Sequence, residues 1–364
     1  MDKLMRDILS DLDRWQRNGG KIALATVVQT WGSSPRRAGA KMGLASEGQF
    51  SGSVSGGCVE NAVIEAGIEA LKTKRPKLLH FGVTDETAWE VGLACGGSID
   101  VFVNPMDKKI FQELNAVIEN EEQAVIVTLI RGPQEILGRE ILIHEDGRRV
   151  GVIDSQWDGM ILELANDLAA RGISHRVSLS ESVEIFADVI LPAPTLIIVG
   201  GVHIAVALSA LARPLNFRTV VIDPRRAWGN RERFPNADQL IQAWPEEAFE
   251  KIRITRSTAI VMLTHDPKLD DPALKIALKS RAFYIGALGS KTTNEKRRAR
   301  LLNEGISESQ FAKLNAPIGL DIGAQTPEEI ALAIMAEVVK ASRKQDQANV
   351  KEEAKYAQST VFNH

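Results

Sequence analysis

A cysteine, Cys58, follows two glycines in the run SVSGGCVEN at residues 53–61, where a turn leads into a predicted helix. Glycines permit a sharp turn that leaves backbone N–H groups unpaired, and the helix adds a partial positive charge at the same point. Such a place binds anions and favours the thiolate form of a cysteine. The turn therefore predicts a cofactor-binding site formed by Gly56, Gly57 and Cys58. A small cysteine packed in the core at a helix start is the alternative.

Two other segments carry residues that suit the same chemistry. Arg36 and Arg37 lie in a loop before the turn, and guanidinium groups bind phosphate with two parallel hydrogen bonds. Cys95, Gly96 and Gly97 form a second glycine–cysteine loop. We expect the three segments to converge on one anionic, thiol-reactive or metal-bearing ligand, although paired arginines are also common on ordinary surfaces.

Length, net charge and cysteine count limit the class of protein to which this chain can belong. With 364 residues the chain is long for one core, so two domains are expected. A net charge of −3 argues against a general nucleic-acid binder. No apolar run is long enough for a membrane span, and the amino terminus has no apolar signal core. Only two cysteines occur, which excludes a disulfide framework, makes structural zinc improbable and fits a cytoplasmic location.

The fold class predicted from hydrophobic periodicity is α/β, with an N-terminal α+β domain over residues 1–190. Its predicted helices cover residues 4–15 and 59–71, and its strands include 21–28 and 98–103. Three more strands, near 124–130, 140–144 and 148–153, are predicted with a hairpin turn at Asp146 and Gly147. No internal repeat is visible. The runs SGGC and CGGS only mirror each other in order.

Pro192 and Pro194 mark a domain boundary, because prolines interrupt regular structure. Residues 195–342 then alternate short apolar strands with helices, which predicts a Rossmann-like, doubly wound parallel sheet. The remaining residues, 343–364, are predicted to be a polar tail, either a frayed helix or disordered.

The second domain begins like a dinucleotide site. Gly200 and Gly201 follow its first strand, and Asp223 stands 23 residues after Gly200, near the spacing of a ribose-binding carboxylate. However, Val202 occupies the position where a second fingerprint glycine approaches the pyrophosphate, so an NAD-type cofactor is disfavoured. His203, next to the turn, is a candidate ligand residue, with a packing or capping role as the alternative.

Two further loops of this domain are candidates for ligand binding. His265 and Asp266 follow a strand at the carboxyl edge, where such sheets bind ligands, although Asp266 would equally cap the next helix. Gly289 and Ser290 precede a helix start that suits a phosphate group.

Several of these runs resemble the XdhC/CoxI family, over about residues 10 to 342. In the first domain the matching runs are GSSPRRAGAKM at 32–42, SGGCVE at 55–60 and CGG at 95–97. In the second they are DPR at 223–225, RFP at 233–235, THD at 264–266, YIGALGS at 284–290 and PIGLDIGA at 317–324.

The resemblance implies a molybdenum cofactor chaperone rather than a catalyst. Such a protein binds a molybdopterin-type cofactor, protects it while its terminal sulfido ligand is installed, and delivers it to an apo molybdenum hydroxylase. The implied partners are a xanthine, aldehyde or carbon monoxide dehydrogenase and a cysteine desulfurase, with a homodimer as the base-rate expectation. Carried onto this chain, Cys58 is the candidate contact to the cofactor and its molybdenum, and Cys95 the second. The rival hypothesis is an NAD(P)-dependent oxidoreductase. A third is that the Rossmann-like domain binds the nucleotide of a dinucleotide cofactor.

Overall fold

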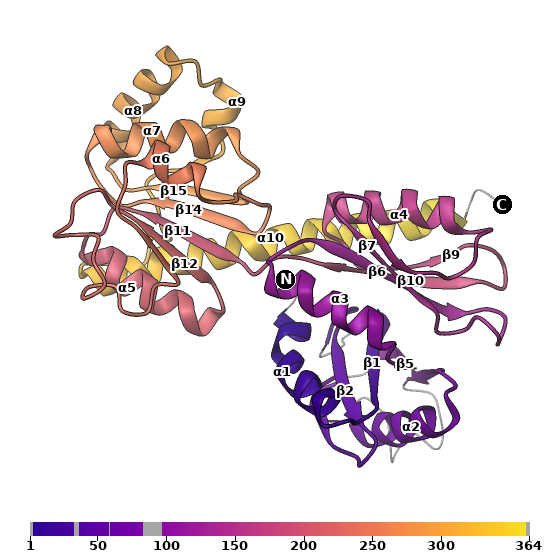
Figure 1. Ribbon diagram of the computed structural model, residues 1–364. Helices are drawn as coiled ribbons and strands as arrows, with labels where there is room; N and C mark the ends of the chain where they lie inside the picture. The colour runs from indigo at the N-terminus through magenta and orange to yellow at the C-terminus, as the bar shows by residue number, and fades with distance from the viewer. Residues whose placement is uncertain (1–2, 33–35, 58, 83–96, 362–364) are drawn as a thin grey trace. The chain divides into compact units, whose positions relative to one another are not determined.

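A computed structural model describes residues 3–32, 36–57, 59–82 and 97–361 (Figure 1). The chain divides into two compact units, one formed mainly by Asp2–Pro192 and the other by Ala193–Ala348. The first unit holds two antiparallel sheets, and the second holds one parallel sheet.

The first sheet of the N-terminal unit, sheet A, follows helix α1 (Lys3–Arg17) and has the strand order β3-β2-β1-β5-β4. Its elements are β1 (Ile22–Trp31), β2 (Lys41–Ala45), β3 (Phe50–Gly52), α2 (Glu60–Thr73), β4 (Lys77–Phe81) and β5 (Ser98–Pro105). All its strands pair in antiparallel fashion. One face of the sheet packs on the apolar side of α2, which buries Val63, Ala66 and Ala70.

The second sheet, sheet B, follows helix α3 (Lys108–Glu119) and has the order β8-β7-β6-β10-β9. Its elements are β6 (Ala124–Arg131), β7 (Glu140–His144), β8 (Arg149–Gly151), α4 (Asp158–Arg171), β9 (His175–Ser178) and β10 (Glu184–Ile190). The predicted hairpin is confirmed, because β7 pairs with β8 across a turn in which Gly147 has a φ of 85°.

The two sheets are copies of one arrangement, so the expectation of no internal repeat is wrong. Each copy runs helix, three strands, helix, two strands, and the two strand orders are identical when counted from the first strand. The registers agree as well. Thr26 of β1 faces Lys41 of β2, as Thr128 of β6 faces Glu140 of β7. Val27 and Leu129 each accept a hydrogen bond from a glycine in the loop that precedes the second strand.

Backbone sterics preserve the repeat where side chains have diverged. Gly52 and Gly151 both have φ near 86–89°, and a Cβ at either would lie 2.3–2.5 Å from a carbonyl oxygen of the neighbouring strand. No other residue fits that backbone. By contrast, the equivalent pair Lys41 and Glu140 has opposite charge, which hides the duplication from a comparison of side-chain types.

The C-terminal unit confirms the Rossmann-like prediction. Its parallel sheet has the order β13-β12-β11-β14-β15-β16, which is the doubly wound order with a switch point between β11 and β14. The strands are β11 (Thr195–Val199), β12 (Arg218–Ile222), β13 (Gln239–Ile241), β14 (Thr258–Met262), β15 (Tyr284–Ala287) and β16 (Leu314–Asn315).

Helices cover both faces of this sheet (Figure 1). One face packs on α5 (His203–Ala212) and the first part of α10 (Pro327–Val361). The other packs on α6 (Pro245–Glu250), α7 (Pro267–Lys279) and α8 (Lys291–Asn303). A short 3-10 turn (Arg213–Leu215) and α9 (Glu308–Phe311) complete the unit.

The predicted polar tail is helical as far as Val361, because α10 continues through residues 343–361. The segment is rich in Ala, Lys, Glu and Gln, which have high helix propensity. Of the two alternatives, the helix is therefore realised and the disordered tail is not.

Candidate functional site

The glycine-rich turn of the N-terminal unit surrounds a carboxylate of its own chain. Glu60, the first residue of α2, is 8% exposed and accepts hydrogen bonds from the backbone N–H groups of Val54, Ser55, Gly56, Gly57 and Val59 at 2.8–3.3 Å. The hydroxyls of Ser53 and Ser55 also donate to it, at 2.8 and 2.5 Å. The turn therefore forms an anion cradle, as its glycines predicted.

The group bound in the cradle is the carboxylate of Glu60, whereas the sequence predicted an external ligand there. Burial alone raises the pKa of Glu60, but the hydrogen bonds from Ser55, Ser53 and the backbone outweigh burial and lower it to about 2. The carboxylate is thus ionised at neutral pH and takes up the N–H groups that the sequence left for a ligand. An external anion would bind there only by displacing Glu60.

The other predicted site residues of this unit lie next to strand ends at the same end of sheet A. β1 ends at Trp31, which pairs with Ser98, so Gly97 stands next to the end of β1. Arg36 and Arg37 follow that same end of β1, and the cradle follows the end of β3 beside the start of β2. Three of the predicted ligand residues, Cys58, Cys95 and Gly96, lie outside the described residues.

At the Rossmann turn the predicted ribose ligand is enclosed. Asp223 is fully buried, and its Oδ2 accepts hydrogen bonds from the N–H of Gly201 and from Arg225, both at 2.7 Å. Its Oδ1 accepts from the backbone N–H and the Nε of Arg225, both at 2.9 Å. Burial raises the pKa of Asp223, but these bonds outweigh it and hold the pKa below its ordinary value. The carboxylate therefore stabilises the turn.

Protein backbone also covers the turn. A Cβ at Gly201 would lie 2.5 Å from the carbonyl oxygen of Trp228, and Arg233 donates hydrogen bonds to the carbonyl oxygens of both residues. The Trp228 ring has the guanidinium groups of Arg225 and Arg233 within 5.2 and 5.0 Å of its centre. His203, one residue after the Val202 N-cap of α5, is exposed.

From this geometry we expect no binding of NAD(H) or NADP(H) at millimolar concentration. Both oxygens of the Asp223 carboxylate, the predicted ribose ligand, already accept hydrogen bonds from Gly201 and Arg225. Val202 also occupies the position where the dinucleotide fingerprint has its second glycine. Isothermal calorimetry and nicotinamide fluorescence test this expectation. Saturable binding of either cofactor that is lost in Asp223→Asn would contradict it and revive the oxidoreductase hypothesis.

Two of the predicted residues line one pocket at the carboxyl edge of the parallel sheet. A pocket of about 230 Å³ lies between the ends of β14 and β15 and is lined by His265, Pro267, Asp270, Ser290, Thr292, Thr293, Lys296, Arg297 and Arg300. Ser290 caps α8 by accepting a hydrogen bond from the N–H of Thr293 at 3.2 Å, after a Gly289 with a φ of 136°. Asp266 caps α7 through the N–H of Lys268, which realises the alternative considered for it.

Two buried residues that line this pocket, Arg297 and Asp270, belong to one polar network. Arg297 is 2% exposed, donates to the carbonyl oxygen of Leu288 at 3.0 Å, and pairs with Asp270 at 3.2 Å. Burial raises the pKa of Asp270 to about 6, against the lowering effect of Thr264 and Arg297. Arg300 pairs with Asp271 at 2.6 Å, so Lys296 supplies the positive charge beside a hydroxyl-rich helix start of the kind that binds phosphate.

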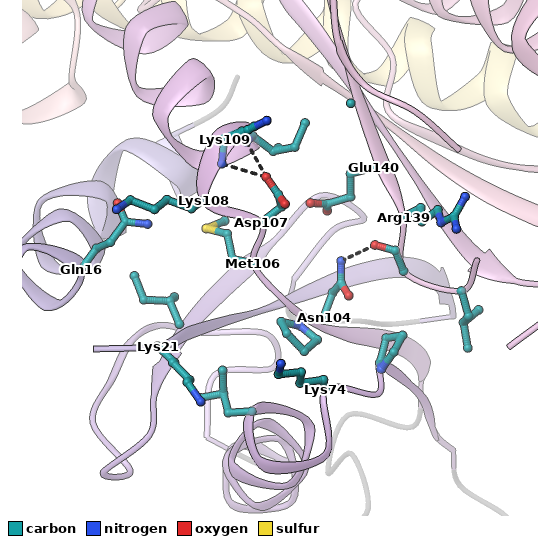
Figure 2. A pocket seen from close by; sticks show the side chains of 18 of the residues that line it. Gln16, Lys21, Lys74, Asn104, Met106, Asp107, Lys108, Lys109, Arg139 and Glu140 are labelled. Atoms are coloured by element: carbon teal, nitrogen blue, oxygen red, sulfur yellow. Dashed lines mark hydrogen bonds between the residues drawn. The ribbon is translucent and has the colours of Figure 1, made fainter. Parts of the chain in front are cut away.

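A third place has no counterpart among the motifs of the sequence. A pocket of about 900 Å³ lies at the end of sheet A opposite the cradle, where α2 ends and α3 begins. Figure 2 shows Lys108 and Lys109 above it, Lys21 and Lys74 below it, and Asn104 between the two pairs. Its other lining residues include Met106, Asp107, Ile110, Leu137, Gly138, Arg139, Glu140 and Val152. The lysines come from three separate segments, so no local motif announces them.

By contrast, the role of Glu60 as a hydrogen-bond acceptor for the turn could have been predicted from the sequence. An acidic residue just inside a helix that follows a glycine turn is the standard partner for the unpaired N–H groups of that turn. The run SGGCVE carries that signal, but the prediction assigned the N–H groups to a ligand.

The described part of the chain offers neither a membrane span nor a cluster of metal ligands. No helix there is long and apolar enough to cross a membrane. Among the same residues, no group of three or more His, Cys, Asp or Glu side chains is placed to hold a metal ion.

Two protein-family models match this chain, one in each of its two units. Residues 15–82 match the model of the XdhC and CoxI family, and residues 196–338 match that of the XdhC Rossmann domain. A Bacillus subtilis protein named as a probable xanthine dehydrogenase component is 29% identical over 92% of this chain and 97% of its own length. The molybdenum cofactor insertion chaperone PaoD of Escherichia coli is 26% identical over 88% of this chain and 83% of its own.

A solved structure has the same fold throughout. A crystal structure from Bacillus halodurans, described as a xanthine dehydrogenase, aligns with a TM-score of 0.70 at 26% identity. The alignment covers 93% of this chain and 97% of that one, so it spans both units.

Proposed function

Because this chain belongs to the XdhC/CoxI family, we propose that it binds a molybdenum cofactor and acts as the chaperone that inserts it into a molybdenum hydroxylase. The observation that carries the proposal is similarity along nearly the whole chain to a relative named as a molybdenum cofactor insertion chaperone. Under this proposal the protein holds the cofactor while its sulfido ligand is installed and then releases it to the apo enzyme.

The described residues fit a ligand with an anionic phosphate end. The carboxyl-edge pocket offers Ser290, Thr293 and Lys296 at a helix start, where phosphate binds readily. Bound cofactor would add the dithiolene-held molybdenum, for which a thiolate of Cys58 is the proposed soft ligand. Cys95 is the second candidate. A cysteine desulfurase and an apo hydroxylase of the xanthine, aldehyde or carbon monoxide dehydrogenase type are the proposed partners.

The test is the pterin and molybdenum content of protein purified from molybdenum-replete cells. Wild type is expected to yield fluorescent oxidised pterin, and Cys58→Ser is expected to lose most of it because the metal contact is gone. Cys95→Ser, which also removes one thiol, is the matched comparison and should keep more. Full pterin content in Cys58→Ser would remove Cys58 from the mechanism, and pterin-free wild type would contradict the chaperone function itself.

A further inference from the structure

The 900 Å³ pocket carries an excess of positive charge that the chain as a whole does not have. The charged residues that line it are five basic and two acidic ones: Lys21, Lys74, Lys108, Lys109, Arg139, Asp107 and Glu140. The whole chain, by contrast, has a net charge of −3. The positive charge is therefore a local property of this surface.

Both acidic side chains of the pocket are engaged by neighbouring groups of their own unit. Asp107 caps α3 by accepting hydrogen bonds from the N–H groups of Lys109 at 2.7 Å and Ile110 at 3.1 Å. Glu140 accepts a hydrogen bond from Thr128 at 3.1 Å. Among the described residues, neither carboxylate forms an ion pair with a lysine of the pocket.

The four lysines stand in two pairs on opposite sides of the pocket. Figure 2 shows Lys108 and Lys109 on one side and Lys21 and Lys74 on the other, with Asn104 between the pairs. All four are exposed, and within the described ranges none of their ammonium groups forms an ion pair. A single phosphate or carboxylate would contact one pair at most, so an occupant that neutralises all four must be longer and carry several charges.

An extended polypeptide meets this requirement. Successive side chains of an extended chain point to opposite sides, so neighbouring acidic residues would reach the two lysine pairs. The pocket also has apolar surface, because Val152, which is 53% exposed, and Leu137 line it. An apolar residue of the bound segment would remove that surface from water.

We propose that this pocket docks an extended acidic segment of a partner protein, with an apolar residue among its carboxylates. A polypeptide is favoured over nucleic acid or an anionic membrane, because the net charge of −3 repels a large polyanion and apolar side chains line the pocket. The pocket lies beyond the end of α2 opposite the glycine–cysteine turn, at roughly the 20 Å length of that helix, so docking leaves the turn free.

Fluorescence anisotropy with labelled peptides tests the docking. The probe is a Gly-Glu-Glu-Leu-Glu-Glu-Leu-Glu peptide, and its control has glutamine in place of every glutamate. At about 50 mM NaCl the acidic peptide is expected to bind at least about tenfold more tightly than the control, since several exposed ion pairs contribute together. Raising NaCl to about 500 mM should remove most of that difference, because salt screens exposed charges.

Substitutions on each side of the pocket show whether one segment spans it. Lys108→Gln/Lys109→Gln and Lys21→Gln/Lys74→Gln each remove two charges at exposed positions. Each double variant should weaken binding of the acidic peptide about threefold or more. An effect of only one of the two would show that the occupant contacts a single side, which contradicts an extended segment across the pocket.

Lys72→Gln/Lys77→Gln is the matched control, because it removes two exposed lysines outside the pocket and should leave peptide binding unchanged. No saturable binding, equal binding of the glutamine peptide, or equal weakening in this control would each overturn the proposal. So would oligothymidylate that binds as tightly as the acidic peptide, which would indicate a nucleic-acid site. Self-association that sedimentation detects in wild type and not in the pocket variants would make a second copy of the chain the occupant instead.

These measurements do not involve the pterin content of protein from molybdenum-replete cells. The chaperone function and the docking of an acidic segment can therefore fail separately.

Discussion

Replacing Lys41 by methionine is expected to lower the free energy of unfolding by about 3–5 kcal/mol. Lys41 is 4% exposed and its ammonium lies 2.5 Å from the carboxylate of Asp188, which is also buried. Methionine fills a similar volume but leaves Asp188 charged and without its cation in the space between sheets A and B. An uncompensated buried charge of this kind is among the most destabilising changes available to a protein.

The design includes a rescue and a control. Lys41→Met/Asp188→Asn removes both charges and keeps a side chain that can accept the 2.8 Å hydrogen bond from Ser174. The asparagine also matches the other copy of the repeat, where Asn104 of β5 occupies the position equivalent to Asp188 of β10. This double variant should regain at least half of the loss. Lys77→Met breaks an exposed pair with Glu69 and should cost no more than about 1 kcal/mol.

Urea unfolding followed by circular dichroism measures the loss, and hydrogen exchange of peptides from β2 and β10 locates it. Localisation is needed because a chain with two units need not unfold in one step. A double variant no more stable than Lys41→Met would mean that the unpaired charge is not the cause.

Glu60→Gln is expected to destabilise the N-terminal unit by roughly 2–3 kcal/mol at neutral pH. The neutral amide keeps one acceptor oxygen but turns an NH₂ group toward backbone N–H donors that the carboxylate now satisfies. Because the pKa of Glu60 is lowered to about 2, its contribution is fully present above the ordinary pKa of 4.5. It is lost as the pH falls from 4.5 towards 2.

Unfolding measured from pH 7 down to pH 3 checks both parts. The gap between wild type and Glu60→Gln should narrow as the pH falls below about 4.5. Glu65→Gln changes an exposed glutamate on the same helix and should stay within about 0.5 kcal/mol of wild type. A constant gap across the pH range would show that the cradle does not hold an ionised carboxylate.

A third variant asks whether the cradle accepts a ligand. Glu60→Ala empties it, so added acetate or formate should raise the melting temperature of this variant more than that of wild type. Equal effects on both proteins would mean that the turn collapses once Glu60 is removed.

The parallel sheet was predictable because its strands are continuous apolar runs, and the segments between them have the periodicity of helices. Thr195–Val199 and Thr258–Met262 are buried on both faces, which leaves such strands no polar alternation. The antiparallel unit was predictable only strand by strand. Its duplication lies in strand register and in glycines such as Gly52 and Gly151, whose requirement comes from neighbouring backbone rather than from their own sequence.

For the candidate sites, the sequence by itself determined that the run SVSGGCVEN is an anion-binding turn and that the two loops after β14 and β15 precede helix starts. Both are local properties of glycines, hydroxyls and helix termini. Only the tertiary structure decided that Glu60 fills the cradle, that Asp223 is enclosed by Arg225 and Gly201, and that lysines from three segments share one pocket with Glu140. Those outcomes depend on which distant side chains folding brings within a few ångströms, because hydrogen bonds and burial act through space and not along the chain.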